Sequence, residues 1–278
     1  MFGREKPAQG GCCGADAPEA PRRVPMVAGN WKMNPPTYSA AVQLAQLVVD
    51  RLKNSWEGKV DVVMFPPFTA LRGVSNVISF DKSFAQVGAQ DCYTAESGAF
   101  TGEVSVNMIK DLDCTWCLVG HSERRSVIGE PDALVREKCA ALAAKGVSPM
   151  LCVGEPEDVY DAGGTVDYVS AQVRAALSDI ELAPADLAVA YEPVWAIGSG
   201  RVPTPEHVQK VAEAIRKTVE EVRCPVRAAS TRILYGGSVK PGNAAQFAAL
   251  PDVDGVLVGG DSLDADKFFE IVEKVMNA

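Results

Sequence analysis

Short apolar runs recur at regular intervals along the chain. They are rich in Val, Leu and Ile, and several of them end in glycine. Runs that are apolar at nearly every position are typical of strands buried on both faces, as in a parallel sheet. The pattern predicts eight strands, at residues 24–29, 60–65, 84–88, 115–120, 149–154, 187–191, 232–236 and 255–259.

Between several of these runs, apolar residues follow a helical spacing. The clearest helix is predicted to begin with Thr204 as N-cap, followed by Pro205 in the first helical position and Glu206 in the first turn. His207 comes next and is predicted to lie on the surface. Two more helices are predicted, one before the second strand and one from Asp266. The three apolar stripes consist of Val42, Ala45, Val48, Val49 and Leu52; Val208, Val211, Ala212, Ile215, Val219 and Val222; and Phe268, Val272 and Val275.

The alternation of eight strands with helices predicts an α/β fold, a closed (β/α)8 barrel. The alternative is an open, doubly wound parallel sheet, but the count of eight and the single rhythm favour the barrel. In both folds, the functional groups are expected at the carboxyl ends of the strands.

The 278 residues are predicted to form one barrel domain, residues 24–278, behind an amino-terminal tail. Residues 1–23 are rich in Gly, Pro and Ala and poor in large apolar groups, which predicts disorder. Cys12 and Cys13 lie in this tail. Metal binding or disulfide formation there is the alternative to an inert segment.

The net charge is −9 at pH 7, which argues against a binder of nucleic acid or anionic membranes. A small anionic substrate held by a few local groups remains compatible with it. No apolar run approaches the roughly 18 residues of a membrane helix, and the amino terminus lacks the apolar segment of a secretory signal. Eight cysteines are too few for a disulfide scaffold, so we expect a reduced, cytoplasmic protein.

Polar side chains follow three of the predicted strands. Asn30 and Lys32 come at the end of the first, and residues two apart share a face, so they are expected to project together toward an anion. His121 follows the fourth strand, where a helix amino terminus would favour a neutral imidazole. Glu192 follows the sixth, and Pro193 restricts its backbone, which suits a general base. A surface lysine, a structural histidine and a capping glutamate are the alternatives.

Glycine-rich segments follow the last three strands. The apolar tip at residues 196–200 is typical of a lid. The glycine pairs at 236–237 and 259–260 stand where this fold often binds phosphate through backbone N–H groups. Cys114 and Cys117 form a C-x-x-C pair, but no second pair or histidine completes a zinc set, so no metal site is predicted.

Six segments closely resemble the triosephosphate isomerase family. They are GNWKMN at 29–34, GAFTGE at 98–103, VGHSERR at 119–125, YEPVWAIG at 191–198, YGGSV at 235–239 and LVGG at 257–260. The resemblance runs from about residue 24 to the carboxyl terminus, in order, and leaves the tail outside.

This resemblance implies a (β/α)8 TIM barrel that interconverts dihydroxyacetone phosphate and D-glyceraldehyde 3-phosphate through an enediolate, without cofactor or metal. By position, Glu192 moves the proton and neutral His121 polarises the carbonyl. Lys32 and Asn30 bind the substrate and stabilise the developing negative charge. The implied phosphate ligands are Gly198, Ser238, Gly259 and Gly260; the implied supporting residues are Glu123, beneath the site, and Cys152, behind the base; and the implied lid is Val194, Trp195, Ala196, Ile197, Gly198, Ser199 and Gly200.

The resemblance also implies a homodimer. Residues 93–101 resemble the loop that enters the neighbouring subunit, where Thr101 would brace the partner's Asn30 and the partner's Lys32. Phe100, close to the tip of this loop, is hard to reconcile with a solvated surface loop.

Three residues depart from the family pattern. Ser199 stands where Thr is usual in the lid. Pro203 stands where Ala is common, and its fixed φ is expected to stiffen a hinge. Asp261 follows the second glycine pair, where a small neutral residue is usual; we expect it to cap the short helix there, together with Ser262, and not to face the phosphate.

Two other functions compete with this one. A phosphate-binding barrel epimerase would need metal ligands, and an aldolase would need a Schiff-base lysine on an inner strand; neither set is visible in the sequence. A non-catalytic binding protein on the same barrel is the other alternative, although every implied catalytic residue is present. The expected partners are triose phosphates and a second copy of the chain, with neither nucleic acid nor membrane.

Overall fold

The eight predicted strands form a closed parallel barrel in the computed structural model, which describes residues 23–178, 180 and 187–278. The strands follow one another in chain order, and β1 pairs in parallel with β8 to close the sheet. The open, doubly wound alternative is therefore wrong. The strands are β1 Met26–Asn30, β2 Asp61–Phe65, β3 Gln86–Ala89, β4 Trp116–Val119, β5 Ser148–Val153, β6 Ala188–Tyr191, β7 Arg232–Tyr235 and β8 Gly255–Val258.

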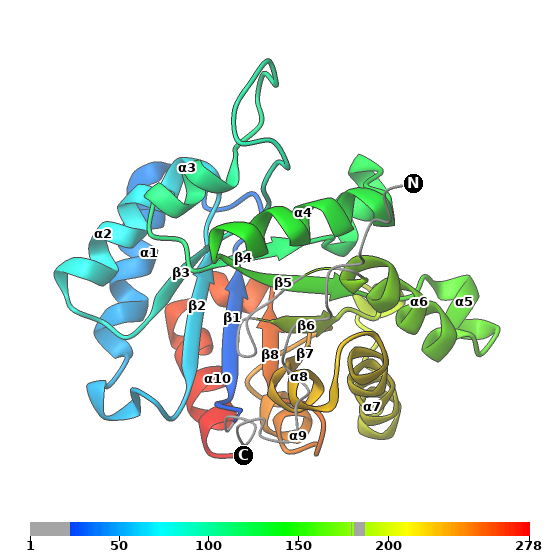
Figure 1. Ribbon diagram of the computed structural model, residues 1–278. Coiled ribbons are helices and arrows are strands. Elements are labelled where there is room, and N and C mark those ends of the chain that lie inside the picture. Colours follow the sequence, from blue (N-terminus) through cyan, green and yellow to red (C-terminus); the bar gives the residue numbers. More distant parts are fainter. Residues whose placement is uncertain (1–22, 179, 181–186) are drawn as a thin grey trace.

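Helices surround the barrel on the outside (Figure 1). The predicted helices correspond to α1, α7 and α10, and the N-cap of α7 is confirmed, since Thr204 Oγ1 accepts a hydrogen bond from the His207 N–H. The helices are α1 Tyr38–Arg51, α2 Leu71–Phe80, α3 Val106–Asp111, α4 Asp132–Lys145, α5 Glu157–Asp161, α6 Thr165–Leu177, α7 Pro205–Val222, α8 Pro225–Ser230, α9 Ala244–Ala248 and α10 Ala265–Met276. Shorter turns are η1 Asn54–Trp56, η2 Phe68–Ala70, the π-helical η3 Arg124–Ile128, η4 Val194–Ala196 and η5 Gly260–Leu263. No helix in the described ranges combines the length and apolar character needed to cross a membrane.

Alternate residues of every strand except β3 enter two separate apolar layers; the apolar residues of β3, Val87 and Ala89, belong only to the outer one. One layer fills the inside of the barrel and the other lies between the strands and the helices; on β1, for example, Met26 and Ala28 belong to the first and Val27 to the second. This explains why the strands appear in the sequence as continuous apolar runs. The inner layer consists of Met26, Ala28, Val63, Phe65, Trp116, Leu118, Met150, Cys152, Ala188, Ala190, Leu234 and Leu257.

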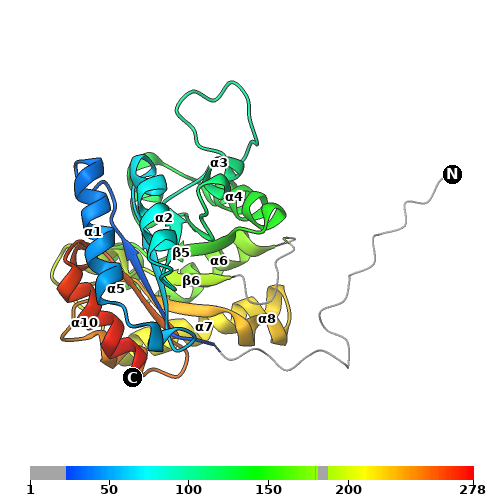
Figure 2. The ribbon, with the colours of Figure 1, turned by 90° about the vertical axis from the view of Figure 1, so that its left-hand side faces the viewer.

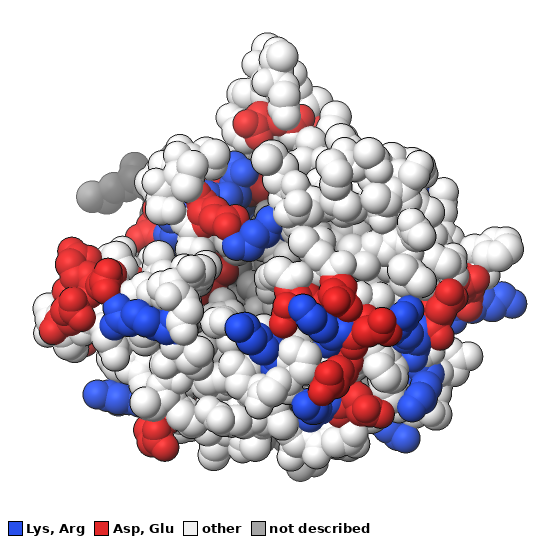
Figure 3. Space-filling view, turned by 180° about the vertical axis from the view of Figure 1, so that it is seen from behind, with Lys and Arg blue, Asp and Glu red and all other residues white. Residues whose placement is uncertain are grey.

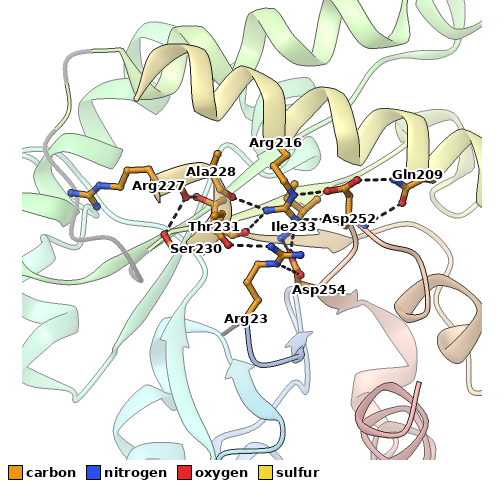
Figure 4. Close-up of polar contacts among 11 residues, drawn as sticks. Arg23, Gln209, Arg216, Arg227, Ala228, Ser230, Thr231, Ile233, Asp252 and Asp254 are labelled. Carbon is orange, nitrogen blue, oxygen red and sulfur yellow. Dashed lines mark hydrogen bonds and ion pairs between the residues drawn. The ribbon is translucent and has the colours of Figure 1, made fainter. Parts of the chain in front are cut away.

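A polar network closes the barrel at the amino-terminal ends of the strands (Figure 4). Arg216 on α7 pairs with Asp252 at 2.6 Å and with Asp254 at 2.9 Å. Asp254 also pairs with Arg23, at 2.5 Å, and its backbone carbonyl accepts from the N–H of Met26. Arg23, which the predicted boundary assigns to the tail, is thus bound to the barrel, whereas residues 1–22, including both tail cysteines, lie outside the described residues.

A long loop between β3 and α3 projects from the opposite end (Figures 1 and 2). Tyr93 forms an isolated parallel bridge with Ser105 at the base of the loop. The ring of Phe100 folds back to lie 4.7 Å from the ring of Tyr93, and Phe100 remains 43% exposed. The loop therefore has internal structure but presents an apolar side chain to its surroundings.

Candidate active site

The carboxyl ends of β1, β4, β6, β7 and β8 surround one small cavity. All four residues predicted to be catalytic contribute to its wall, although they come from distant parts of the chain. The lining consists of Asn30, Lys32, His121, Glu192, Ile197, Gly236, Gly237, Leu257 and Gly259.

Asn30 and Lys32 are held together by a tight turn at the end of β1. The Lys32 backbone has φ of +54°, a left-handed conformation that is uncommon for a residue with a side chain. Two hydrogen bonds hold it there: the Lys32 N–H donates to Asn30 Oδ1 at 2.9 Å, and Gln90 Nε2 donates to the Lys32 carbonyl at 2.8 Å. The two side chains do share the cavity, but through this turn and not through an extended strand.

The carboxylate of Glu192 is buried, and each of its two oxygens has a hydrogen-bond partner. Its Oε1 lies 2.9 Å from His121 Nε2, and its Oε2 accepts the Ser122 N–H at 2.9 Å. Burial acts to raise the pKa of Glu192, but His121, the Ser122 N–H and Lys32 stabilise the charged form more strongly, so the pKa is lowered. Glu192 is therefore an ionised base at neutral pH.

Two glycines make room for Glu192. A Cβ at Gly154 would lie 1.7 Å from the Glu192 carbonyl oxygen, and one at Gly236 would lie 3.0 Å from its Cγ. The Glu192 N–H also donates to the Val153 carbonyl at 2.7 Å. The close approach of the β5 and β6 ends fixes the backbone of the base.

His121 makes a hydrogen bond through each ring nitrogen. Nε2 faces Glu192, and Nδ1 accepts the backbone N–H of Glu123 at 3.2 Å. Burial lowers the pKa of His121, but the charges of Glu192 and Glu123 outweigh burial and raise it. The bond to Nδ1 opposes protonation, because only an unprotonated nitrogen accepts it. The observed geometry is that of a neutral imidazole with its proton on Nε2.

Glu123 does not lie beneath the site, contrary to expectation. Its side chain is half exposed at the rim, and its Oε1 pairs with Lys32 Nζ at 2.6 Å. The tight turn after His121 directs the Glu123 N–H toward the imidazole and its carboxylate toward Lys32, with Oε2 at 3.7 Å from His121 Nδ1. Cys152, in contrast, is buried inside the barrel, where burial and the nearby Glu192 charge raise the pKa of its thiol.

A buried ionic cluster follows the same turn and was not predicted. Lys138 Nζ pairs with Asp91 at 2.7 Å and with Glu130 at 2.5 Å. Arg124, directly after Glu123, pairs with the same two carboxylates. The cluster anchors the segment that carries His121 and Ser122.

The predicted phosphate ligands are only partly brought together. Gly259 lines the cavity, and a Cβ on it would lie 3.8 Å from Lys32 Cε. Gly198, Ser238 and Gly260 do not belong to the cavity lining. Gly260 begins the short turn η5, with Gly259 as its N-cap.

Asp261 does not cap a helix, so that expectation is wrong. The η5 turn has no side-chain cap, and Asp261 instead contacts Lys267 Nζ at 3.5 Å. Asp264 caps α10 by accepting the N–H groups of residues 266 and 267. The hydroxyl of Ser262 donates to the Gly259 carbonyl at 2.6 Å and supports the turn.

The predicted lid begins with η4 and reaches the cavity through Ile197. Its Trp195 is buried, stacks on Tyr160 with ring centroids 4.1 Å apart, and donates through Nε1 to Glu155 Oε1 at 2.7 Å. Glu155 was missed, although it directly follows a predicted strand, which is the position that marks the other site residues. Ser199 Oγ donates to the Trp195 carbonyl at 2.9 Å within the lid.

His207 is not a free surface residue, contrary to the sequence-based expectation. Its side chain is 23% exposed, and its Nε2 lies 3.0 Å from the hydroxyl of Tyr191. Periodicity within α7 could not reveal this contact, because the covering side chains come from β6, α5 and the lid.

The remaining titratable groups show no further centre in the described part of the chain. The six cysteines there, including Cys114 and Cys117, are buried and form no disulfide with one another, and the described residues hold no group of three His, Cys, Asp or Glu side chains suited to a metal. On the face shown in Figure 3, Lys and Arg are interspersed with Asp and Glu and form no continuous basic area.

Comparison with known proteins agrees with this geometry. The family model described as triosephosphate isomerase matches residues 25–275. A triosephosphate isomerase of Corynebacterium efficiens is 46% identical over 257 residues, which cover 92% of this chain and 98% of that protein. Those of Corynebacterium glutamicum and Leifsonia xyli are each 45% identical, over 90% of this chain and 96% and 97% of their own lengths. The chain belongs to the triosephosphate isomerase family.

Proposed function

We propose that the residues around this cavity carry out the family's reaction, the interconversion of dihydroxyacetone phosphate and D-glyceraldehyde 3-phosphate in glycolysis and gluconeogenesis. The observation that carries the proposal is the convergence of Glu192, His121, Lys32 and Asn30 on one cavity. Isomerisation next to a carbonyl requires a base, a proton donor for the oxygen, and positive charge near the developing oxyanion. These four residues supply all three.

Glu192 removes the proton from the carbon beside the carbonyl and returns it to the neighbouring carbon. His121 donates its Nε2–H to the substrate oxygen, so the substrate must take over the hydrogen bond that Glu192 now accepts. Lys32 and Asn30 stabilise the enediolate. A positioned base contributes about 10²–10⁴-fold and one oxyanion donor about 10²–10³-fold. The reaction moves protons within one substrate, so its balance calls for no redox cofactor.

We place the phosphate at the ends of β7 and β8. Gly259 lines the cavity beside Lys32, and Gly260 begins a short turn whose first N–H groups suit an anion. Gly198 and Ser238 would complete this set when the lid closes over the substrate. Closure of residues 194–200 also excludes water, which matters because an exposed enediolate phosphate readily eliminates its phosphate.

The projecting loop supports a homodimer. The loop extends well beyond the barrel, and its tip shows no acidic or basic side chain in Figure 3. Its Phe100 is 43% exposed. An exposed apolar group on a structured projection is typical of an interface. In the dimer, Thr101 would brace the partner's Asn30 and the partner's Lys32.

We also place the protein in the cytoplasm, because its described cysteines are buried and no disulfide joins them to one another.

The mechanism is tested by running the reaction in D2O. Transfer through Glu192 predicts that D-glyceraldehyde 3-phosphate made from dihydroxyacetone phosphate carries solvent deuterium at C2, since the carboxyl proton exchanges with solvent. Product formed without any deuterium would show that the transferred proton never exchanges with solvent, and would contradict transfer through an exchanging Glu192 carboxyl.

A further inference from the structure

We propose that His207 is a positioning residue for the catalytic base: its Nε2–H donates to Tyr191 and thereby orients the hydrogen bonds on both sides of Glu192. The proposal rests on the function proposed above and extends it to a residue outside the cavity. His207 touches neither the substrate cavity nor the reacting atoms.

Tyr191 is the last residue of β6 and directly precedes Glu192. Its ring is almost wholly buried, and its hydroxyl lies between two partners, 3.1 Å from Glu155 Oε1 and 3.0 Å from His207 Nε2. Glu155 Oε1 also accepts a hydrogen bond from Trp195 Nε1, at 2.7 Å. One carboxylate oxygen therefore holds the residue before the base and the first turn of the lid after it.

Counting protons fixes the direction of these bonds. The indole N–H of Trp195 can only donate, so Glu155 Oε1 is an acceptor. Tyr191 has a single hydroxyl proton. If that proton went to His207, lone pairs of the Tyr191 and Glu155 oxygens would face each other at 3.1 Å. Tyr191 must therefore donate to Glu155, and His207 must carry its proton on Nε2 and donate to Tyr191.

The surroundings of His207 favour the neutral imidazole that this direction requires. Burial and the charge of Lys210 lower the pKa of His207 and outweigh the opposing effect of Glu155. The rings of Tyr160 and Trp195 lie edge-on to the imidazole, with centroids 5.4 and 6.3 Å away.

The direction of the bond is tested first, by ¹⁵N NMR at pH 8. The chain has two histidines, so the His207→Gln spectrum assigns both. We expect His207 to be protonated on Nε2. A proton on Nδ1 would overturn the proposal, whatever the catalytic activity proves to be.

The positioning role is tested with a matched pair of variants. His207→Gln keeps an N–H donor at a similar reach, whereas His207→Leu removes it. We expect His207→Leu to lower kcat/KM about tenfold, within the roughly 10²-fold that a 1 Å misplacement of a catalytic group costs, and to release more inorganic phosphate per isomerisation turnover. His207→Gln should keep kcat/KM and the phosphate released per turnover close to their wild-type values. In a Tyr191→Phe background, His207→Leu should have no additional effect.

A purely structural residue would give a different result. The positioning role would be refuted if the Gln and Leu variants lost kcat/KM equally. It would also be refuted if the Leu variant had a lower Tm but unchanged kcat/KM and phosphate release. Because phosphate release and isomerisation are measured on the same enzyme, an inactive wild type would refute the proposed function and leave the tautomer test standing.

Discussion

The backbone N–H of Glu123 donates to Nδ1 of His121 at 3.2 Å. This contact assigns the tautomer of the imidazole, since Nδ1 can accept only when it carries no proton. His121 is thus prepared to donate from Nε2, the nitrogen that faces the cavity and now contacts Glu192. Because the donor is the backbone N–H of Glu123, replacing the Glu123 side chain leaves this control of the His121 tautomer in place.

We expect ¹⁵N NMR of the free protein at pH 8 to show His121 as neutral imidazole, protonated on Nε2. His121→Leu should lower kcat about 10²–10³-fold, the effect of losing one donor to an oxyanion, with a much smaller change in KM. An imidazolium at pH 8, or a variant that keeps wild-type kcat, would contradict the assigned role.

The lowered pKa of Glu192 predicts the acid limb of the pH profile. A carboxylate whose folded pKa lies below 4.5 stays charged until the pH falls beneath that value. Log kcat/KM should therefore fall first as His121 and the substrate phosphate gain protons, and should gain a further unit of slope from Glu192 only below 4.5. Steady-state measurements of kcat/KM between about pH 4 and pH 8 will give this profile. A third unit of slope that already begins above pH 5 would show that the base has a raised pKa.

Gly154→Ala is expected to damage both stability and activity. The new Cβ would lie 1.7 Å from the carbonyl oxygen of Glu192, so the β5 and β6 ends must separate and the base must move. We expect a clear loss of Tm and a fall in kcat of at least tenfold, since a 1 Å displacement costs up to about 10²-fold. Gly242→Ala is the matched control, because a Cβ there meets no atom within 4 Å. Equal behaviour of the two variants in thermal melts and assays would contradict this explanation.

Phe100→Asp should dissociate the proposed homodimer. The substitution places a charge on the exposed apolar group of the projecting loop. Sedimentation velocity should show a monomer, and activity should fall because Thr101 no longer braces the opposite site. Phe80→Asp is the control, since Phe80 is an 87% exposed aromatic residue at the carboxyl end of α2 and not part of the loop. A Phe100→Asp variant that stays dimeric, or a monomer with full activity, would refute the assigned interface.

The barrel could be predicted because strands that are buried on both sides leave a continuous apolar signal in the sequence. The cavity residues could be found because parallel strands in a closed barrel bring their carboxyl ends together. Lys32 was placed correctly by an incomplete argument: strand alternation predicts a shared face, whereas a left-handed turn produces it.

The errors arose where packing between distant segments decides the outcome. The turn after His121 sends the Glu123 carboxylate outward to Lys32. Asp264 supplies the cap that had been expected from Asp261. His207 is covered by side chains from elements that its own helix pattern does not describe. Local sequence patterns carry no record of such contacts.

The most direct test of the account compares the wild-type protein with Glu192→Gln. D-Glyceraldehyde 3-phosphate is added, and dihydroxyacetone phosphate is detected as NADH oxidation by glycerol-3-phosphate dehydrogenase. We predict rapid turnover by the wild type and a loss of about 10²–10⁴-fold in kcat for Glu192→Gln, the usual contribution of a positioned base. Turnover that survives the substitution would remove Glu192 as the base, and a folded wild-type protein without turnover would contradict the function itself.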